Sequence, residues 1–322
     1  MTQTPEKIRA GVVGVGHMGR YHVVAYSELF KVEVIGVCDT DPEKAEATAA
    51  PFNYPWFTDY RNLFGKVDVV SIAVPTELHF AVAKDFLEHD IHVLLEKPVT
   101  PTLAEAEQLF ELAAKRNLAL HIGHVERFNG ALQEMKKIIS NPFLVESRRI
   151  GPWTGRSVQT GVVMDLMIHD IDIVLNLVDK PVADLHVMGR KVRSDYEDIV
   201  SLHIDFENGA MGSLLASRVS EEKIRTLDVQ QRDAYIHLDY ATQDIQIHRG
   251  ASSSYQIMSN SLNYRQESVI ERLFVHRGNP LKHEIQHFLD NAMANGDRLI
   301  SVDKELRSLK VALKVLEKIR DA

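Results

Sequence analysis

A lysine stands where an apolar run of the chain ends, because Ile91–Leu95 is followed by Glu96, Lys97 and Pro98. Proline disfavours helical backbone for the residue before it, so Lys97 is expected in extended backbone at the tip of a strand. A cationic side chain placed there can stabilise negative charge that develops on a substrate oxygen. Lys97 is therefore a candidate catalytic residue.

A second group of ionisable residues lies in the apolar segment Gly161–Val178. Asp165, His169 and Asp172 are spaced by four and then three residues, which places them on one face of a predicted helix. A neutral histidine can accept a proton near neutral pH, and an aspartate one turn earlier can orient its ring. The alternative is a core histidine paired with a carboxylate. Since the sequence offers no third ligand at suitable spacing, we predict no metal.

A glycine-rich loop follows the first predicted strand. It contains Gly14, Gly16 and Gly19, with His17 and Met18 between the last two. In such a loop the first glycine permits a tight turn, the second admits a pyrophosphate, and the third allows close packing of helix and strand. The phosphates would meet the amino end of the following helix, so the loop predicts a dinucleotide site.

Asp39 lies 20 positions after Gly19, at the end of the second predicted strand. A carboxylate there can accept hydrogen bonds from the adenosine ribose, and it would repel a 2′-phosphate. The pattern favours NAD over NADP. The alternative is that Asp39 only begins the next turn, together with Asp41.

The elements that would position these residues are strands and helices in alternation. Strands are expected in the first third of the chain at Ile8–Val13, Val32–Val37, Val67–Val74, Ile91–Leu95 and Leu118–Ile122. This alternation is typical of βαβ units. It predicts an α/β domain, residues 1–123, with a doubly wound parallel (Rossmann) sheet of six strands, of which these five segments are assigned.

The remainder, residues 124–322, has another pattern. Polar and apolar residues alternate in Val200–Phe206, and short strands follow with polar turns between them. We predict an α+β domain with a large, mostly antiparallel sheet, and a loop at Ala251–Asn263. Helices are expected at Pro280–Asn295 and Asp303–Ile319, the last a candidate to pack back on the first domain.

Composition limits the possible partners and compartments. The chain has 322 residues and a net charge of −8, from 37 basic and 45 acidic side chains. This balance argues against a nucleic-acid partner. Cys38 is the single cysteine, which suggests a reducing compartment. Since the sequence shows neither a signal peptide nor an apolar membrane span, we predict a cytoplasmic protein.

Taken in order, these motifs resemble the Gfo/Idh/MocA family of oxidoreductases over essentially the whole chain. The resemblance is carried by Gly14–Gly19, Val74-Pro75-Thr76 with His79, Glu96-Lys97-Pro98, and Asp165–Asp170. It implies a sugar or cyclitol substrate, with Lys97, Asp165 and His169 as catalytic residues. It also implies cofactor contacts by Pro75, Thr76, His79, Glu96 and Lys97, and a homodimer or homotetramer formed through the antiparallel sheet.

The sequences of the segments Gly123–Asn129 and Asp165–Asp172 resemble those of a subgroup of that family that oxidises C3 of UDP-N-acetylglucosamine. Such enzymes supply a 3-keto sugar to an aminotransferase in lipopolysaccharide biosynthesis. Gly130 stands where that subgroup would have proline. Candidate substrate contacts, besides the catalytic residues, are His124, Arg127, Arg149 and Arg156, the arginines as diphosphate ligands. The alternatives are arginines on a solvated strand face and a hinge role for His124.

Other functions fit parts of the pattern. An inositol or other free-sugar dehydrogenase would use the same residues, and a glycosidase could use NAD transiently. Ketone reduction would prefer NADPH, which Asp39 disfavours. A non-catalytic NAD-sensing regulator would not need Lys97, Asp165 and His169.

Overall fold

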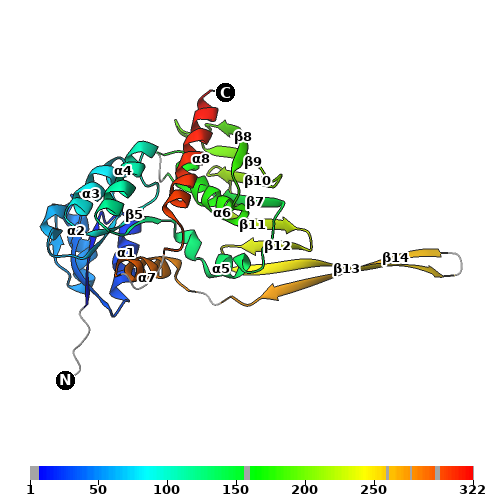
Figure 1. Cartoon of the computed structure of the whole chain (residues 1–322), viewed down its shortest axis with the longest axis horizontal. Coiled ribbons are helices and arrows are strands. Elements are labelled where there is room, and N and C mark those ends of the chain that lie inside the picture. The colour runs from blue at the N-terminus through cyan, green and yellow to red at the C-terminus, as the bar shows by residue number, and fades with distance from the viewer. Residues whose placement is uncertain (1–6, 156–159, 259–260, 276–277, 294–297, 322) are drawn as a thin grey trace, which may run out of the picture. The chain divides into compact units, whose positions relative to one another are not determined.

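The computed structural model describes residues 7–155, 160–258, 261–275, 278–293 and 298–321. The chain forms two compact units (Figure 1). Unit 1 contains residues 1–128 and 279–309, and unit 2 contains residues 129–278 and 310–322. The first boundary therefore lies five residues after the predicted position 123, and 279–309 belongs to unit 1 instead of the second domain.

Unit 1 contains the predicted doubly wound sheet, with strands in the order β3-β2-β1-β4-β5-β6 and all pairs parallel. Its strands are β1 (Ile8–Val13), β2 (Val32–Cys38), β3 (Trp56–Phe57), β4 (Val69–Ile72), β5 (His92–Glu96) and β6 (Leu120–Gly123). Its helices are α1 (His17–Ser27), α2 (Pro42–Ala49), α3 (Thr76–Glu88), α4 (Leu103–Lys115) and α7 (Pro280–Ala292). Short helical turns are η1 (Ala50–Phe52), η2 (Tyr60–Leu63) and η3 (Val125–Phe128).

The strand order reverses direction between β1 and β4. In open parallel sheets, ligands bind outside the carboxyl ends of the strands at such a reversal. The loops after β1, β2, β4 and β5 carry the glycines, Asp39, Pro75 and Lys97, so the topology brings the predicted cofactor residues to one edge.

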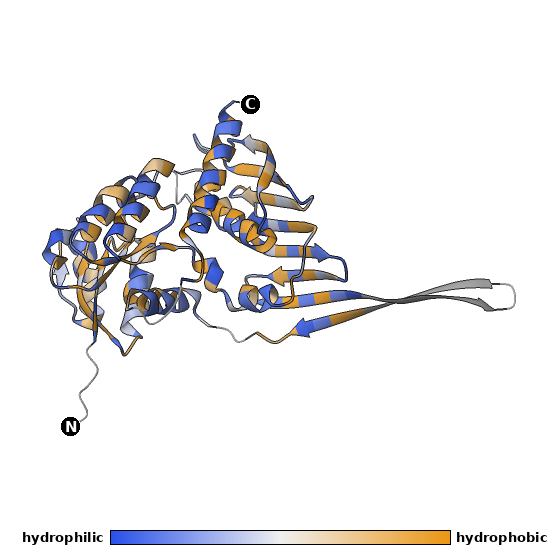
Figure 2. Ribbon diagram, viewed as in Figure 1, coloured by the Kyte–Doolittle hydropathy of each residue, from blue (hydrophilic) through white to orange (hydrophobic). Residues whose placement is uncertain are grey.

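The core of unit 1 explains why α7 belongs to it. The strands are buried and apolar, and they appear as the hydrophobic parts of the ribbon in Figure 2. From α7, Leu281, Ile285 and Phe288 pack in the same cluster as Val23 and Tyr26 of α1. Apolar residues at i, i+4 and i+7 form the buried stripe that attaches this helix.

Unit 2 contains an eight-stranded sheet in the order β14-β13-β12-β11-β7-β10-β9-β8, antiparallel except for the pair β7–β10. Its strands are β7 (Leu144–Ile150), β8 (Val182–Arg190), β9 (Ile199–Phe206), β10 (Met211–Ser217), β11 (Ile224–Gln231), β12 (Ala234–Asp239), β13 (Asp244–Met258) and β14 (Ser261–Leu273). Its helical segments are α5 (Gly130–Lys136), the π-helical turn η4 (Val163–Met167) and α6 (Ile168–Val178). Helix α8 (Val302–Arg320) has its first residues in unit 1 and the rest in unit 2.

Two predictions about this unit are wrong. Most of the expected loop Ala251–Asn263 is strand, because β13 continues to Met258 and pairs with β14 through Ile257↔Leu262. The expected single helix Gly161–Val178 is two segments, the π-helical turn η4 and then α6.

Candidate functional site

Two glycines of the loop after β1 have the steric setting that the sequence predicts. Gly14 has a φ of +82°, and a Cβ there would lie 2.6 Å from the carbonyl oxygen of Ala73. A Cβ on Gly19 would overlap the carbonyl oxygen of Gly14. Neither position accepts a side chain, so the turn and the packing of α1 against β1 both require glycine.

Gly16 has a different role, because its Cβ position faces open space. No described atom lies within 4 Å of a Cβ built at this residue, which is exposed at the amino end of α1. No described side chain caps that end, and the first turn, which begins with His17 and Met18, carries no acidic residue. The N–H groups and positive end of this 11-residue helix fit the pyrophosphate of a dinucleotide.

Asp39 follows β2 and holds the glycine-rich loop. Its Oδ2 accepts a hydrogen bond from Val15 N at 2.9 Å, and its Oδ1 accepts one from Asp41 N at 3.0 Å. Because a carboxylate has about four acceptor sites, two remain for ribose hydroxyls. Asp39 therefore begins the next turn, and the contact with the ribose stays a prediction.

The loop after β4 begins helix α3 at Thr76, with Pro75 as its exposed N-cap. His79, predicted as a cofactor contact, is instead buried with 1% of its surface exposed. Its Nδ1 lies 2.9 Å from the carbonyl oxygen of Pro98, and its Nε2 lies 2.9 Å from that of Val74. Burial lowers the pKa of its ring. His79 joins the loops after β4 and β5, and so positions cofactor residues from inside the unit.

Glu96 is buried at the carboxyl end of β5, where helix α1 meets the sheet. Its Oε1 accepts from Nε2 of His22 at 2.9 Å, and its Oε2 accepts from the backbone N–H of Lys97 at 3.3 Å. The other ring nitrogen of His22 lies 3.1 Å from Ser71 Oγ. A Cβ on Gly123 would come within 3.1 Å of the Glu96 side chain, so glycine leaves room for this carboxyl. Burial raises the pKa of Glu96, but the bond from His22 and nearby positive charge outweigh it and lower the net pKa.

Lys97 follows Glu96 directly, and its side chain is partly buried. Its peptide bond to Pro98 is cis. The lysine stands at the same edge of the sheet as the glycine-rich loop and Pro75, at the carboxyl ends of the parallel strands. This is the position in which a cationic group can act beside a bound dinucleotide.

Arg127, predicted as a diphosphate ligand, is engaged inside unit 1. It is 4% exposed, and its Nη1 lies 2.6 Å from Oε2 of Glu305. Arg298 binds the other oxygen of the same carboxylate at 3.2 Å. His124 is also buried, with Ser308 Oγ at 3.5 Å from its Nε2. Arg127 is therefore part of a buried ion-pair network, which argues against a direct contact with substrate.

In unit 2, Asp165 lies in η4 and His169 lies in the first turn of α6, and both are partly buried. Asp172 is buried and its Oδ1 accepts from Nδ2 of Asn176 at 3.3 Å. The π-helical turn changes the regular four-residue alignment that the sequence predicts between Asp165 and His169, and such turns are frequent at functional sites.

The backbone of η4 is fixed by Glu197, which precedes β9. Its carbonyl oxygen accepts from Val162 N at 2.9 Å, and its Oε1 accepts from Val163 N at 3.2 Å. A Cβ on Gly161 would overlap the same carboxylate. A glycine and a distant glutamate therefore hold the segment that carries Asp165.

Arg149 of β7 is also predicted as a diphosphate ligand, but it binds Asp170 instead. Its Nε and Nη2 each lie 2.9 Å from one oxygen of that carboxylate, and both residues are at most 3% exposed. Tyr240 lies beneath the guanidinium, with its ring centroid 5.6 Å away. The prediction that Arg149 binds a diphosphate does not fit this geometry, because the pair attaches α6 to β7. Arg156 falls outside the described residues.

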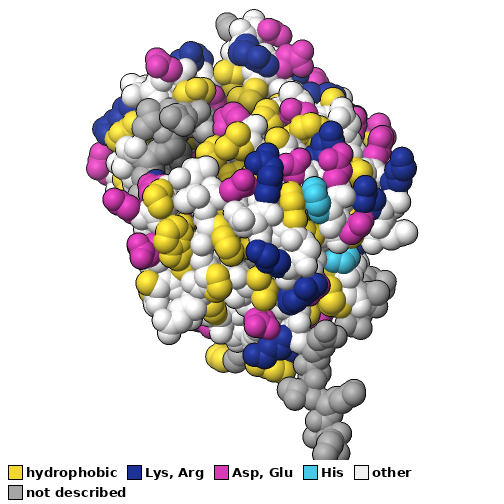
Figure 3. Space-filling view, turned by 90° about the vertical axis from the view of Figure 1, so that its left-hand side faces the viewer, with side chains coloured by type: hydrophobic (Ala, Val, Ile, Leu, Met, Phe, Trp, Pro, Cys, Tyr) yellow, Lys and Arg dark blue, Asp and Glu magenta, His cyan; other side chains and the backbone are white. Residues whose placement is uncertain are grey.

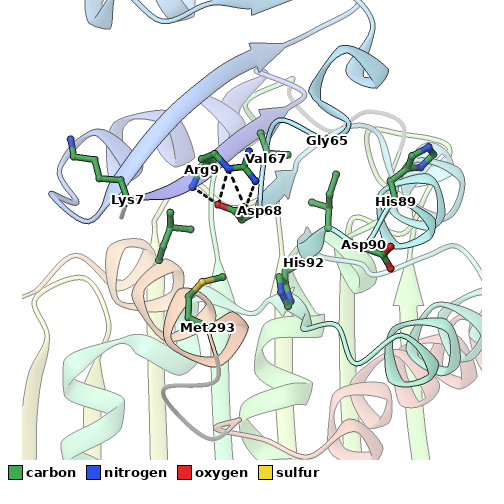
Figure 4. A pocket seen from close by; sticks show the side chains of 11 residues that line it. Lys7, Arg9, Gly65, Val67, Asp68, His89, Asp90, His92 and Met293 are labelled. Carbon is green, nitrogen blue, oxygen red and sulfur yellow. Dashed lines mark hydrogen bonds and ion pairs between the residues drawn. The ribbon is translucent and has the colours of Figure 1, made fainter. Parts of the chain in front are cut away.

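A pocket of about 690 Å³ lies elsewhere, at the amino ends of β1, β4 and β5 (Figure 4). Its lining includes the ion pair of Arg9 with Asp68, and His92. Because β1 separates this pocket from Gly14 by its whole length, roughly 20 Å, the pocket is not the dinucleotide site.

Other kinds of site find no support in the described residues. Among them, no group of three or more His, Cys, Asp or Glu side chains could hold a metal ion. Burial raises the pKa of the Cys38 thiol to about 12, so it is not a nucleophile at neutral pH. No described helix has the length and apolarity to cross a membrane.

Figure 3 shows acidic and basic side chains interspersed on one face of the molecule.

Sequence reasoning assigned no role to several buried residues that bond to the candidate residues or to their partners, or interact with them electrostatically. They are His22, Ser71, Asp170, Glu284 and Glu305. Two local signals were present: His22 lies three residues after Gly19 on the helix that follows the loop, and Glu284 adjoins the apolar stripe of α7.

Comparison with known proteins agrees with this architecture. Residues 8–124 match the model of the oxidoreductase family with a NAD-binding Rossmann fold (GFO_IDH_MocA), and residues 127–237 match the GFO/IDH/MocA C-terminal domain. The chain belongs to this family of oxidoreductases, and unit 1 contains its NAD-binding domain.

Individual relatives within this family are similar to the chain to different degrees. UDP-N-acetylglucosamine 3-dehydrogenase of Acidithiobacillus ferrooxidans is 36% identical over 248 residues, covering 76% of this chain and 79% of that protein. A crystal form of that enzyme superposes with a TM-score of 0.86 at 32% identity and covers 96% of each chain. Inositol 2-dehydrogenase of Salmonella typhimurium is 28% identical over 178 residues, covering 52% of this chain and 53% of that one. The structure of scyllo-inositol dehydrogenase from Lactobacillus casei with NAD(H) and scyllo-inositol has a TM-score of 0.80 at 18% identity, which shows a common fold.

Proposed function

We propose that the protein is a NAD-dependent dehydrogenase that oxidises the C3 hydroxyl of UDP-N-acetylglucosamine to a 3-keto sugar nucleotide. The main support is the 36% identity to an enzyme of that name over three quarters of the chain. An inositol dehydrogenase is the second candidate, supported by lower identity over about half of the chain.

The residues of unit 1 bind the cofactor and prepare the substrate oxygen. The loop at Gly16 and the amino end of α1 hold the pyrophosphate, and Asp39 accepts from the ribose. NAD held there would supply the hydride acceptor for C3. Lys97 stabilises the negative charge that develops on the C3 oxygen. The Glu96 carboxylate accepts a hydrogen bond from the backbone N–H of Lys97 and so holds the backbone of this residue in place.

In unit 2, His169 accepts the hydroxyl proton as general base, and Asp165 orients its ring. Because Arg127 and Arg149 are engaged in buried ion pairs, other groups must bind the diphosphate.

We propose that the protein forms a homodimer or homotetramer through the large sheet. Residues of one sheet face remain exposed, among them Met188 at 68% and Met211 at 48%. Helix α6 packs against β7 and β10 on the other face. Light scattering of the purified protein measures the assembly, and a monomer at micromolar concentration would contradict it.

The test of function is incubation of purified protein with NAD and a panel of UDP-sugars and free cyclitols, followed by absorbance of NADH and by product mass. We expect a mass loss of two hydrogens from UDP-N-acetylglucosamine alone. An aminotransferase that consumes the 3-keto product removes an unfavourable equilibrium. Oxidation of a cyclitol but not of the UDP-sugar would establish the second candidate, and NAD binding without any turnover would indicate a sensing protein.

A further inference from the structure

Helix α7 carries a buried carboxyl group that the proposed reaction does not use. Glu284 is 2% exposed, and neither of its carboxyl oxygens has a hydrogen-bond partner in the described part of the structure. Its neighbours on the helix, Leu281, Ile285 and Phe288, belong to the apolar core of unit 1. A neutral carboxylic acid tolerates this setting far better than an unpartnered carboxylate, which would lose its hydration without compensation.

Titratable or charged groups interact with Glu284 from each neighbouring element. They are Tyr26 and, through Glu96, His22 of α1; Glu96 of β5; Arg127 of η3; and Glu305 of α8. The cation that acts on it in the described part of the chain is Arg127, and this guanidinium already binds Glu305 at 2.6 Å. Burial first, and then the negative charges of Glu96 and Glu305, raise the pKa of Glu284 well above its usual value.

Glu96 is in the opposite state. Its two oxygens accept from His22 and from the N–H of Lys97, and its pKa is lowered. Two carboxyl groups that act on each other in a buried site do not both ionise readily, so a well-bonded one keeps its charge while the other keeps a proton. The contacts of α7 with α1 and β5 place this pair where the helix of the cofactor loop meets the lysine strand.

We propose that Glu284 is a positioning residue that remains a neutral acid, so that Glu96 alone carries negative charge at this junction and holds both His22 and the backbone of Lys97. Its link to catalysis rests on the proposed role of Lys97. Its protonation can be tested without any substrate.

Glu284→Gln keeps the shape and the neutral state at every pH. Above the unfolded pKa of about 4.3, unfolded wild-type protein has released the Glu284 proton while the folded protein retains it. Stability conferred by the proton is therefore present below that value and is lost as pH rises toward the folded pKa. The unfolding constant of wild type relative to the variant should rise by up to about tenfold per pH unit in that window.

Urea unfolding of both proteins at pH 5, 6, 7 and 8 measures this ratio, in a Trp153→Phe background that leaves Trp56 of unit 1 as the probe. Glu107→Gln, an exposed carboxyl on α4, is the matched control and should show no such trend. A ratio that stays constant from pH 5 to 8 would mean that Glu284 is ionised and paired, and it would overturn the proposal.

Infrared spectra give a second measurement, whose refuting outcome depends on the wild-type protein alone. Wild type at pH 7 should show the C=O stretch of a protonated carboxyl group, and Glu284→Gln should lose it. Absence of that band from wild type refutes the proposal.

The positioning role of Glu284 is tested by the pH dependence of kcat. Once a substrate is established, the alkaline limb of kcat should move to higher pH in Glu284→Gln, with the Kd for NAD at pH 7 unchanged within about twofold. An unmoved limb together with the infrared band would leave Glu284 as a buried acid without the positioning role, and would refute that part. Absence of turnover in wild type would refute the proposed function alone.

Discussion

Removal of either partner from the Arg149–Asp170 pair should destabilise unit 2 severely. Both side chains are at most 4% exposed and are joined by two hydrogen bonds of 2.9 Å. Arg149→Met leaves Asp170 as a buried, uncompensated carboxylate, which costs about 3–5 kcal/mol. Replacing both, as Arg149→Met with Asp170→Leu, removes the charges together and should recover most of that loss.

The chain offers a selective probe for this experiment. It has two tryptophans, Trp56 in unit 1 and Trp153 in unit 2. In a Trp56→Phe background, Trp153 fluorescence follows the urea unfolding of unit 2 alone. With a slope of about 1–3 kcal/mol per molar urea, the single variant should unfold at least about 1 M earlier than its parent.

Two results would contradict this reasoning. If Arg149→Met lost less than about 1 kcal/mol, the pair would not be the buried anchor of α6. If the double variant regained stability but required far more UDP-sugar for half-maximal rate, Arg149 would be a substrate ligand as the sequence predicts.

Four further outcomes are expected. Gly16→Ala should fold with a melting temperature near that of wild type but bind NAD at least tenfold more weakly, because its methyl group enters the pyrophosphate space. Gly19→Ala should lose stability itself, since its Cβ overlaps backbone; equal melting temperatures for the two variants would refute the distinction. Lys97→Met should lower kcat by about 10²–10³ and change the Kd for NAD less than about threefold, by stopped-flow and NADH fluorescence. Burial lowers the pKa of His121 to about 3, so stability should fall by up to about 1.4 kcal/mol per pH unit below pH 6.5, where the unfolded imidazole gains a proton. His121→Asn should remove that slope in urea titrations at pH 7, 6 and 5.

The positions of the proposed cofactor residues in the fold were predictable because their signals are local. Three glycines, an aspartate 20 residues later and a lysine before proline each follow a strand, and parallel strands bring such residues to one edge. The two-residue strand β3 is too short to give a periodic signal.

The arginines could not be assigned from sequence, because their partners are distant. Arg149 meets Asp170 across 21 positions and Arg127 meets Glu305 across 178. A basic side chain near a predicted cleft gives the same pattern whether it binds a phosphate or a buried carboxylate. The loop predicted at Ala251–Asn263 failed for a related reason, since cross-strand pairing overrides a Ser-rich composition.

The membership of α7 in unit 1 also has a consequence for synthesis on the ribosome. Tyr26 and Val23 emerge early, yet Ile285 and Phe288, which cover them, are translated only after all of unit 2 up to residue 278. At about 5–20 residues per second, this nascent surface waits on the order of ten to fifty seconds for its cover. A polypeptide that stops at residue 128 would keep that surface bare, and would be a target for chaperones instead of an independent nucleotide-binding module.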